Sequence, residues 1–167
     1  MEIQTLTDEQ LAGQRLMVGF EGTVFNEDLK FLIGTLKVGG VILFSINIEA
    51  PEQIKALCRS IQDYARSCGQ PPLFIAVDQE GGRVARLKDP FTIFPGNPHI
   101  KSEAEAVRFA QITAAEMNQV GINMNMAPVM DVSPEGSDGI MAERAFGSNP
   151  TWVSRLGVKV IEHLQLN

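Results

Sequence analysis

The chain has 167 residues, 44% of them hydrophobic, which is enough for one domain with a hydrophobic core. The formal net charge is −6 and no basic run occurs, so we expect no nucleic acid partner. No apolar run approaches the roughly 20 residues of a membrane span, and the polar, acidic segment 1–14 does not have the pattern of a signal peptide.

The chain begins with alternating helix and strand signals. Thr7 and Gln10 have the spacing of a capping box and predict the start of a first helix. The apolar run 16–20 then predicts a strand. Asn26 can cap a second helix over 27–36, because its side chain can accept a hydrogen bond from the first turn.

The next repeat follows the same order. Gly39 and Gly40 suit the exit of the second helix, and the apolar run 41–44 has the length of a strand. Pro51 is tolerated in the first turn of a helix, so a third helix is expected to begin there. Its predicted buried face consists of Ile54, Leu57, Ile61, Tyr64 and Cys68.

Cys58 and Cys68 are the two cysteines of the chain. On one helix, ten residues at about 1.5 Å each separate them by about 15 Å, whereas a disulfide needs Cα atoms within about 7 Å. We therefore expect free thiols, a reducing compartment and a cytoplasmic location. No histidine lies near them in the sequence, which argues against a metal pair.

A polar cluster follows the third predicted strand, 73–77, whose apolar composition indicates burial on both faces. The strand ends on Asp78, Gln79 and Glu80, two glycines turn the backbone, and two arginines follow, Arg83 and Arg86. One interpretation is a turn that carries ion pairs. The other is a site that hydrogen-bonds a polyol.

The second half of the chain has longer irregular segments. A connection over 81–100 precedes a helix that Ser102 and Glu105 can cap, and the strand 122–130 then ends on Asp131. Segment 132–148 is irregular, and Asn149 and Pro150 start the last helix. The predicted buried face of the helix after Ser102 consists of Val107, Ala110, Ala114, Met117 and Val120.

This order of elements, βαβαβαβα, predicts an α/β fold of parallel strands with helical crossovers. Two architectures fit: a doubly wound open sheet, or part of a (β/α)8 barrel. Ligands meet the carboxyl ends of the strands in both. Asp78 and Asp131 are each predicted to lie one residue past such an end, which favours a binding site there.

Three chemistries can be compared for that site. A nucleotide site is disfavoured, because the glycine pair after Glu80 matches no phosphate-binding loop. Metal ligation by Asp78, Glu80 and Asp131 has no supporting ligand spacing, so we expect no metal and no cofactor. Glycoside chemistry needs two carboxyl groups, and the same three residues supply enough of them.

Three motifs follow one another in the chain. Segment 77–84 reads VDQEGGRV, with Arg86 two residues later and FPGN at 94–97. Segment 121–132 reads GINMNMAPVMDV, and segment 144–150 reads RAFGSNP. These motifs resemble glycoside hydrolase family 3, in its β-N-acetylglucosaminidase (β-hexosaminidase) branch, and the resemblance runs from about Leu11 to the end of the chain.

The resemblance implies a (β/α)8 TIM-type barrel that releases terminal β-linked N-acetylglucosamine with retention of configuration. It assigns the binding of sugar hydroxyls to Asp78, Arg86 and Arg144. A carboxylate can accept from two vicinal hydroxyls, and a guanidinium donates in a planar fork. Three further residues are expected to support this set: Glu80, Arg83 and Asp131.

The chain also departs from the family pattern. The family's lysine-histidine block, its histidine-aspartate general acid and its aspartate nucleophile would all lie beyond Asn167. We therefore expect 1–167 to be one incomplete barrel domain with the sugar-binding half, no catalytic residue of its own and no activity as given. The alternative is a non-catalytic sugar-binding or assembly module. Either way, self-association or a partner that supplies the missing half-barrel is expected.

Overall fold

The computed structural model describes residues 6–166, so the first five residues of the polar amino-terminal segment and Asn167 lie outside the described residues. The described chain forms two compact units. The first contains the residues up to Val77 together with 119–124, and the second contains 78–118 and the residues from Asn125 onward. That the units belong to one domain stays a prediction. Within the described part, no helix combines the length and the apolar character that crossing a membrane requires.

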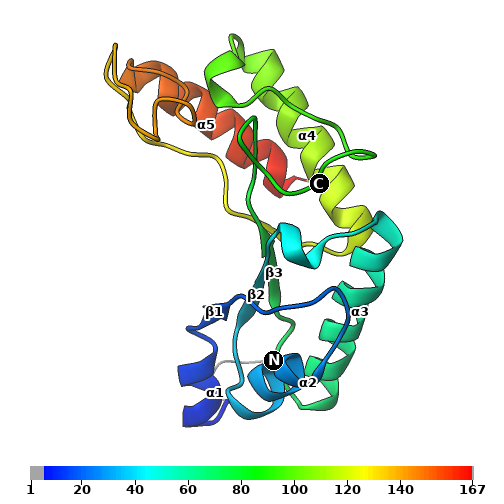
Figure 1. The fold of residues 1–167 in the computed structure, drawn as a ribbon. Coiled ribbons are helices and arrows are strands. Elements are labelled where there is room, and N and C mark those ends of the chain that lie inside the picture. Colours follow the sequence, from blue (N-terminus) through cyan, green and yellow to red (C-terminus); the bar gives the residue numbers. More distant parts are fainter. Residues whose placement is uncertain (1–5, 167) are drawn as a thin grey trace. The chain divides into compact units, whose positions relative to one another are not determined.

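A parallel sheet organises the first unit, and Figure 1 shows β2 and β3 running side by side. Strand β2 pairs in parallel with β1 on one side and with β3 on the other. This confirms the predicted parallel βα arrangement. The strands are, in sheet order, β1 (Met17–Val18), β2 (Gly40–Leu43), β3 (Phe74–Val77) and β6 (Met124–Asn125).

The helices of the first unit begin at the predicted caps. The Thr7 hydroxyl accepts from the Gln10 N–H while the Gln10 side chain accepts from the Thr7 N–H, which is the reciprocal capping box. The Asn26 carboxamide accepts from the Leu29 N–H. The helical segments are α1 (Asp8–Gly13), α2 (Glu27–Lys30), the π-helical η2 (Phe31–Thr35), the 3-10 turn η3 (Ser45–Asn47) and α3 (Pro51–Ser67).

The second helix ends differently from the prediction. It continues from α2 into the π-helical turn η2, and Lys37, with φ of 55°, turns the backbone at its end. Gly39 and Gly40 serve close packing instead of a helix exit. A Cβ on Gly39 would lie 2.3 Å from the Gln14 carbonyl oxygen, and one on Gly40 would lie 2.9 Å from that of Phe74.

The buried face of α3 also differs from the prediction at its carboxyl end. Tyr64 is half-buried and Cys68, which caps the helix, is exposed. The apolar stripe continues through Ala65, because the 3.6-residue period returns there. The strand beyond is likewise only partly buried, since Phe74 is 57% exposed. The buried residues of α3 are Ile54, Leu57, Cys58, Ile61 and Ala65.

The second unit consists of a β-hairpin, two long helices and irregular segments. Helices α4 and α5 lie side by side in Figure 1, and a cluster of buried side chains joins them. Its helical members are Ala106, Phe109, Ala110, Val153, Leu156 and Val160. The elements are β4 (Gln79–Gly81), β5 (Val84–Ala85), the 3-10 turn η4 (Asn97–His99), α4 (Glu103–Val120), whose last two residues belong to the first unit, and α5 (Pro150–Gln165).

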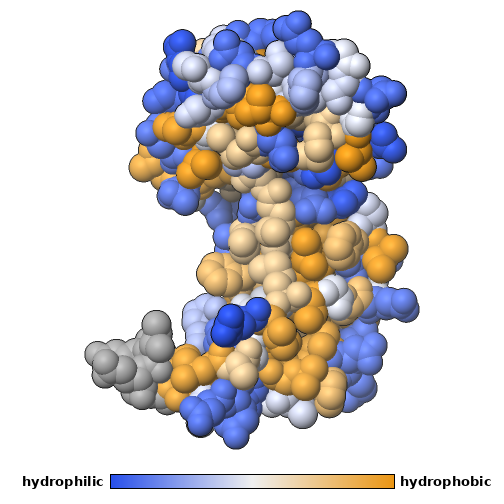
Figure 2. Space-filling view, turned by 90° about the vertical axis from the view of Figure 1, so that its left-hand side faces the viewer, coloured by the Kyte–Doolittle hydropathy of each residue, from blue (hydrophilic) through white to orange (hydrophobic). Residues whose placement is uncertain are grey.

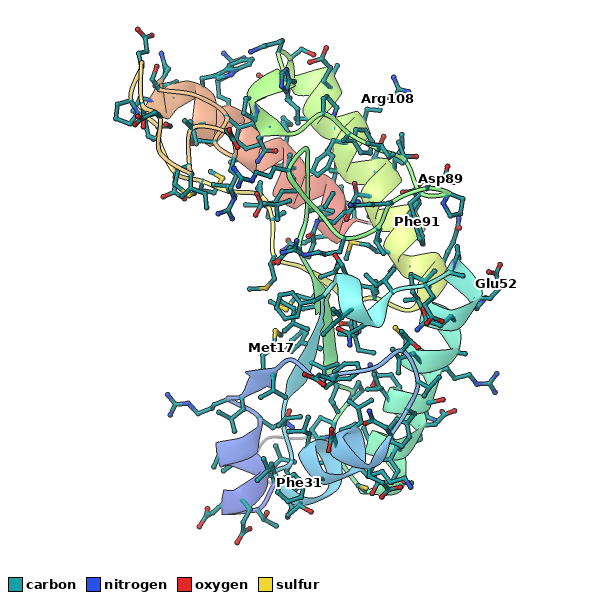
Figure 3. The ribbon with its side chains drawn as sticks, in the orientation of Figure 1. Met17, Phe31, Glu52, Asp89, Phe91 and Arg108 are labelled. Carbon is teal, nitrogen blue, oxygen red and sulfur yellow. The ribbon has the colours of Figure 1, made fainter. Side chains whose placement is uncertain are left out.

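The connection 81–100, predicted as an irregular segment, contains strand β5 and the 3-10 turn η4. Its beginning forms the antiparallel hairpin of β4 and β5. Further on, the N–H and the hydroxyl of Thr92 both donate to the Glu116 carboxylate, which fastens the loop to α4. Asp89 and Phe91 lie on this loop in Figure 3. The loop is therefore held by side chains where no strand partner is present.

The strand predicted over 122–130 is much shorter. Only Met124–Asn125 forms β6, so Asp131 lies six residues beyond Asn125 and not directly after a strand. The Asn123 side chain takes the place of a strand partner, since it accepts from the Ile75 N–H and donates to the Leu73 carbonyl. Pro128 has no N–H to donate and cannot extend the ladder.

Candidate functional site

The first ion pair of the site joins the two ends of the hairpin. Asp78 follows β3 directly, as predicted, and Arg86 follows β5. The Arg86 Nη2 donates to the Asp78 Oδ2 at 2.8 Å. The Asp78 side chain is 21% exposed and the Arg86 side chain is 26% exposed, so each keeps a surface that a ligand can reach.

A second, more buried pair joins the hairpin to the segment before α5. The Arg144 guanidinium donates from Nε to Glu80 Oε2 at 2.9 Å and from Nη2 to Oε1 at 2.6 Å. Two parallel bonds of this kind fix both the orientation and the distance of the guanidinium. The Glu80 side chain is 4% exposed, against 25% for Arg144, so the carboxylate is the hidden member of the pair.

The electrostatics place two more carboxylates near Arg144. The hydrogen bonds that Arg144 donates to Glu80 raise the pKa of Arg144, burial opposes this rise, and the negative charges of Glu80, Asp78 and Asp131 add to it. Asp131 is exposed and acts through its charge. The structure thus brings the carboxylates of Asp78, Glu80 and Asp131 within electrostatic range of Arg144 in the second unit.

Arg83 lies at the turn of the hairpin and pairs outward. Its Nη1 donates to the Glu143 Oε2 at 2.9 Å, and the two side chains are 68% and 62% exposed. Exposed pairs of this kind contribute little to stability. Arg83 therefore supports the segment beside Arg144 and does not enter the buried pair.

The wall behind Glu80 is apolar. A pocket of about 190 Å³ has Glu80 among its lining residues, and Phe94, Ile100 and Phe109 form its apolar part. Its other polar lining residues are His99, Glu105 and Arg108. The rings of Phe94 and Phe109 meet edge to face with centroids 5.0 Å apart. An apolar wall lowers the local dielectric and strengthens the Glu80–Arg144 attraction.

Three carboxamides hold this region through hydrogen bonds to the backbone that the sequence did not predict. The Gln79 side chain accepts from the Arg86 and Leu87 N–H groups and donates to the Leu87 carbonyl. Asn125 accepts from the Gln79 N–H and donates to the Gln79 carbonyl. Asn97 donates to the Arg144 carbonyl at 2.9 Å. All three residues lie inside the motifs quoted above, and this position is the feature of the sequence that could have indicated their role.

The arrangement can bind a polyhydroxylated ligand. Carboxylates accept from hydroxyls, guanidinium groups donate to them, and the two kinds alternate here over a short distance. Among residues 6–166, no three His, Cys, Asp or Glu side chains lie close enough together to hold a metal ion. The donors and acceptors on these side chains are suited to sugar hydroxyls.

Comparison with known proteins gives one consistent family. The model of the glycosyl hydrolase family 3 N terminal domain matches residues 6–167. A beta-hexosaminidase A from Pseudoalteromonas piscicida is 35% identical over 94% of this chain and 30% of its own length. A beta-hexosaminidase from Alkalilimnicola ehrlichii is 37% identical over 84% of this chain and 42% of its own length. The chain therefore spans less than half the length of these relatives.

Solved structures agree with the sequence matches. A glycoside hydrolase family 3 beta-N-acetylglucosaminidase from a Paenibacillus strain superposes with a TM-score of 0.92 at 35% identity, over 96% of this chain and 31% of that protein. A beta-N-acetylhexosaminidase from Beutenbergia cavernae gives 0.84 at 29% identity, over 96% of this chain and 51% of that protein. The parallel βα fold of this chain is the fold of these neighbours.

Proposed function

Because this chain belongs to the family of glycosyl hydrolase family 3 N terminal domains, we propose that the whole protein is a retaining glycoside hydrolase that releases terminal β-linked N-acetylglucosamine. Two beta-hexosaminidases at 35% and 37% identity support this substrate class. Within the protein, this chain supplies the part that holds the terminal sugar.

Asp78, Arg86 and Arg144 are the proposed sugar contacts. The observation that carries the assignment is the ion pair of Asp78 and Arg86 at 2.8 Å, because it presents an acceptor and a donor fork on two partly exposed side chains. A pair of vicinal hydroxyls can bridge such a couple. Each charged hydrogen bond to the sugar is worth roughly 1.5–3 kcal/mol.

Glu80, Arg83 and Asp131 are proposed as supporting residues. Glu80 is 3% exposed, and both of its carboxylate oxygens accept hydrogen bonds from Arg144. Its role is therefore to orient the Arg144 guanidinium. Arg83 holds Glu143, the neighbour of Arg144 in the sequence. Asp131 acts on Arg144 through its charge.

No residue of this chain is proposed as nucleophile or general acid. Glu80 is buried and bound at both oxygens, and Asp78 is bound to Arg86, so neither is arranged to protonate a leaving group. Binding residues by themselves leave the glycosidic bond unprotonated and unattacked. The chain as given is therefore expected to bind the sugar without cleaving its glycosides.

Titration with N-acetylglucosamine tests the binding role. Asp78→Asn keeps the volume of the side chain but removes the charged acceptor, and we expect about tenfold weaker binding or more. Asp63→Asn is the matched control, because Asp63 forms exposed ion pairs with Arg59 and Arg66 on α3. Equal affinity of both variants and the original protein would refute the assignment.

A turnover assay separates the two functional classes. Protein shown by mass to end at Asn167 is mixed with an aryl β-N-acetylglucosaminide, and release of the aryl alcohol at the background rate is expected. Robust release that Asp78→Ala abolishes would show that the catalytic carboxylates lie in this chain. Sugar binding without release by a longer form of the protein would favour the non-catalytic module.

A further inference from the structure

We infer that two buried carboxamides, Gln79 and Asn97, are positioning residues that set where the arginines of the sugar site stand. The link to sugar binding rests on the proposed function, but the positioning of the arginines can be measured without any sugar. Each carboxamide bonds to the backbone at one arginine. Gln79 holds Arg86, and Asn97 holds Arg144.

Gln79 continues the hairpin where its ladder ends. Strands β4 and β5 pair through Gln79 opposite Ala85, and the register shifts between Gln79 and Gly81. Beyond Ala85 the backbone has no strand opposite it in this hairpin. The Gln79 Oε1 accepts from both the Arg86 N–H and the Leu87 N–H at 2.9 Å, and its Nε2 donates to the Leu87 carbonyl at 2.9 Å.

The position of Gln79 is itself fixed. Gln79 is 4% exposed. Its backbone N–H donates to the Asn125 Oδ1 at 3.0 Å, and its carbonyl accepts from the Asn125 Nδ2 at 3.1 Å. Buried backbone groups need such partners, because leaving one unpaired is strongly unfavourable. Two carboxamides in series, those of Asn125 and Gln79, therefore hold the backbone of Arg86, whose guanidinium bonds to Asp78.

Asn97 fixes the second arginine to the same hairpin. The hairpin turn is packed against the segment before Asn97: the Gly82 N–H donates to the Phe94 carbonyl at 2.8 Å, and a Cβ on Gly82 would lie 2.9 Å from the Pro95 oxygen. Asn97 is 1% exposed, and its Nδ2 donates to the Arg144 carbonyl. The backbone of Arg144 is thus tied to the element that carries Glu80.

The orientation of the Asn97 amide follows from its partner. A flipped amide would point an oxygen at the Arg144 carbonyl, where two acceptors repel. Its Oδ1 is consequently buried with no hydrogen-bond partner among the described residues. A buried acceptor without a partner destabilises the fold, so the Asn97 side chain lowers stability at this point. The anchoring of Arg144 is a function that such a loss would serve.

The test uses apolar variants of similar shape, Gln79→Met and Asn97→Leu, which remove the carboxamide. The matched control is Gln62→Met in the first unit. Gln62 clamps a backbone in the same manner, because it donates to the Leu73 carbonyl and accepts from the Leu73 N–H. All three variants remove hydrogen bonds to the backbone, but only the first two touch the arginines of the site.

The structural readout is the side-chain Nε–H signal of each arginine in ¹⁵N-labelled protein. We expect Gln79→Met to shift and broaden the Arg86 signal, Asn97→Leu to do so for Arg144, and Gln62→Met to leave both unchanged. The functional readout is the Kd for N-acetylglucosamine, which should rise about tenfold in the first two variants and stay unchanged in the control.

The outcomes are distinguishable. Guanidinium signals that stay in place in both variants, or that Gln62→Met shifts equally, overturn the inference. If Gln79→Met does not fold, Asn97→Leu, which removes a single hydrogen bond, decides the question through Arg144. If the unaltered protein does not bind N-acetylglucosamine, the proposed function fails, while the signals still decide whether these carboxamides position the arginines.

Discussion

Replacing Arg144 with methionine removes two hydrogen bonds to Glu80 and keeps a side chain of similar length. The buried carboxylate then loses its charged partner, since both of its oxygens bond to Arg144 and its side chain is 4% exposed. Leaving one member of a buried ion pair behind is destabilising by about 3–5 kcal/mol. Because Arg144 is 25% exposed, we expect the lower end, about 3 kcal/mol.

The double variant Glu80→Met with Arg144→Met separates the interaction from the individual side chains. It removes the stranded charge along with its partner, so most of the lost stability should return. Urea unfolding at neutral pH measures all four proteins of the cycle, and the coupling between the two positions should exceed about 1.5 kcal/mol.

An exposed pair in the same unit provides the control. Arg83→Met breaks the bond to Glu143, whose side chain is 62% exposed, and should change stability by less than about 1 kcal/mol. If Arg83→Met and Arg144→Met destabilise equally, or if the two changes at Glu80 and Arg144 are additive, then burial does not govern the strength of this pair and the reasoning is wrong.

Further predictions concern the cysteines and self-association. A maleimide at neutral pH should label exposed Cys68 and spare Cys58, which is 2% exposed and whose pKa burial raises from 9.0 to about 12. The folded state therefore keeps this proton above pH 9, so stability that is fully present below pH 9 falls by about 1.4 kcal/mol per pH unit up to 12. Urea unfolding at pH 8 and at pH 10.5 should show a larger loss of stability in the original protein than in Cys58→Ala. An equal change in the free energy of unfolding in both proteins would contradict the prediction. We also propose that the chain self-associates or takes a partner, because Figure 2 shows hydrophobic surface on the first unit, where Leu16, Phe44 and Phe74 are 48%, 38% and 57% exposed. Its melting temperature should rise with protein concentration, and light scattering that finds a folded monomer with a constant melting temperature would count against this.

Local signals predicted the element order well. Thr7 and Asn26 cap the helices that follow them, and Asn149 accepts from the Trp152 N–H at the start of α5. Each cap depends on residues two or three positions away, so the sequence contains all that it needs. The apolar runs likewise predicted parallel strands, including β1, where Met17 lies (Figure 3).

Errors arose where a distant side chain replaces a local signal. The strand predicted over 122–130 is short because Asn123 supplies the bonds of a strand partner to Leu73 and Ile75, about 50 residues away. The irregular connection after Gly82 is ordered because Gln79 and Glu116 bond to its backbone. The periodic pattern of apolar residues, from which helices and strands are predicted, contains no information on such long-range contacts.

The sequence by itself determined that Asp78 stands at the end of a strand, because strand patterning is a local property. Its motifs also predicted which charged groups belong to the candidate site. Only the tertiary structure decided their pairing. Arg83 is three residues from Glu80 in the sequence, yet it bonds to Glu143. Glu80 instead forms its ion pair with Arg144, which is 64 residues away. The hairpin turn directs Arg83 outward and leaves the Glu80 carboxylate in the interior. A buried carboxylate then requires the cation that the packing of the segment before α5 brings to it.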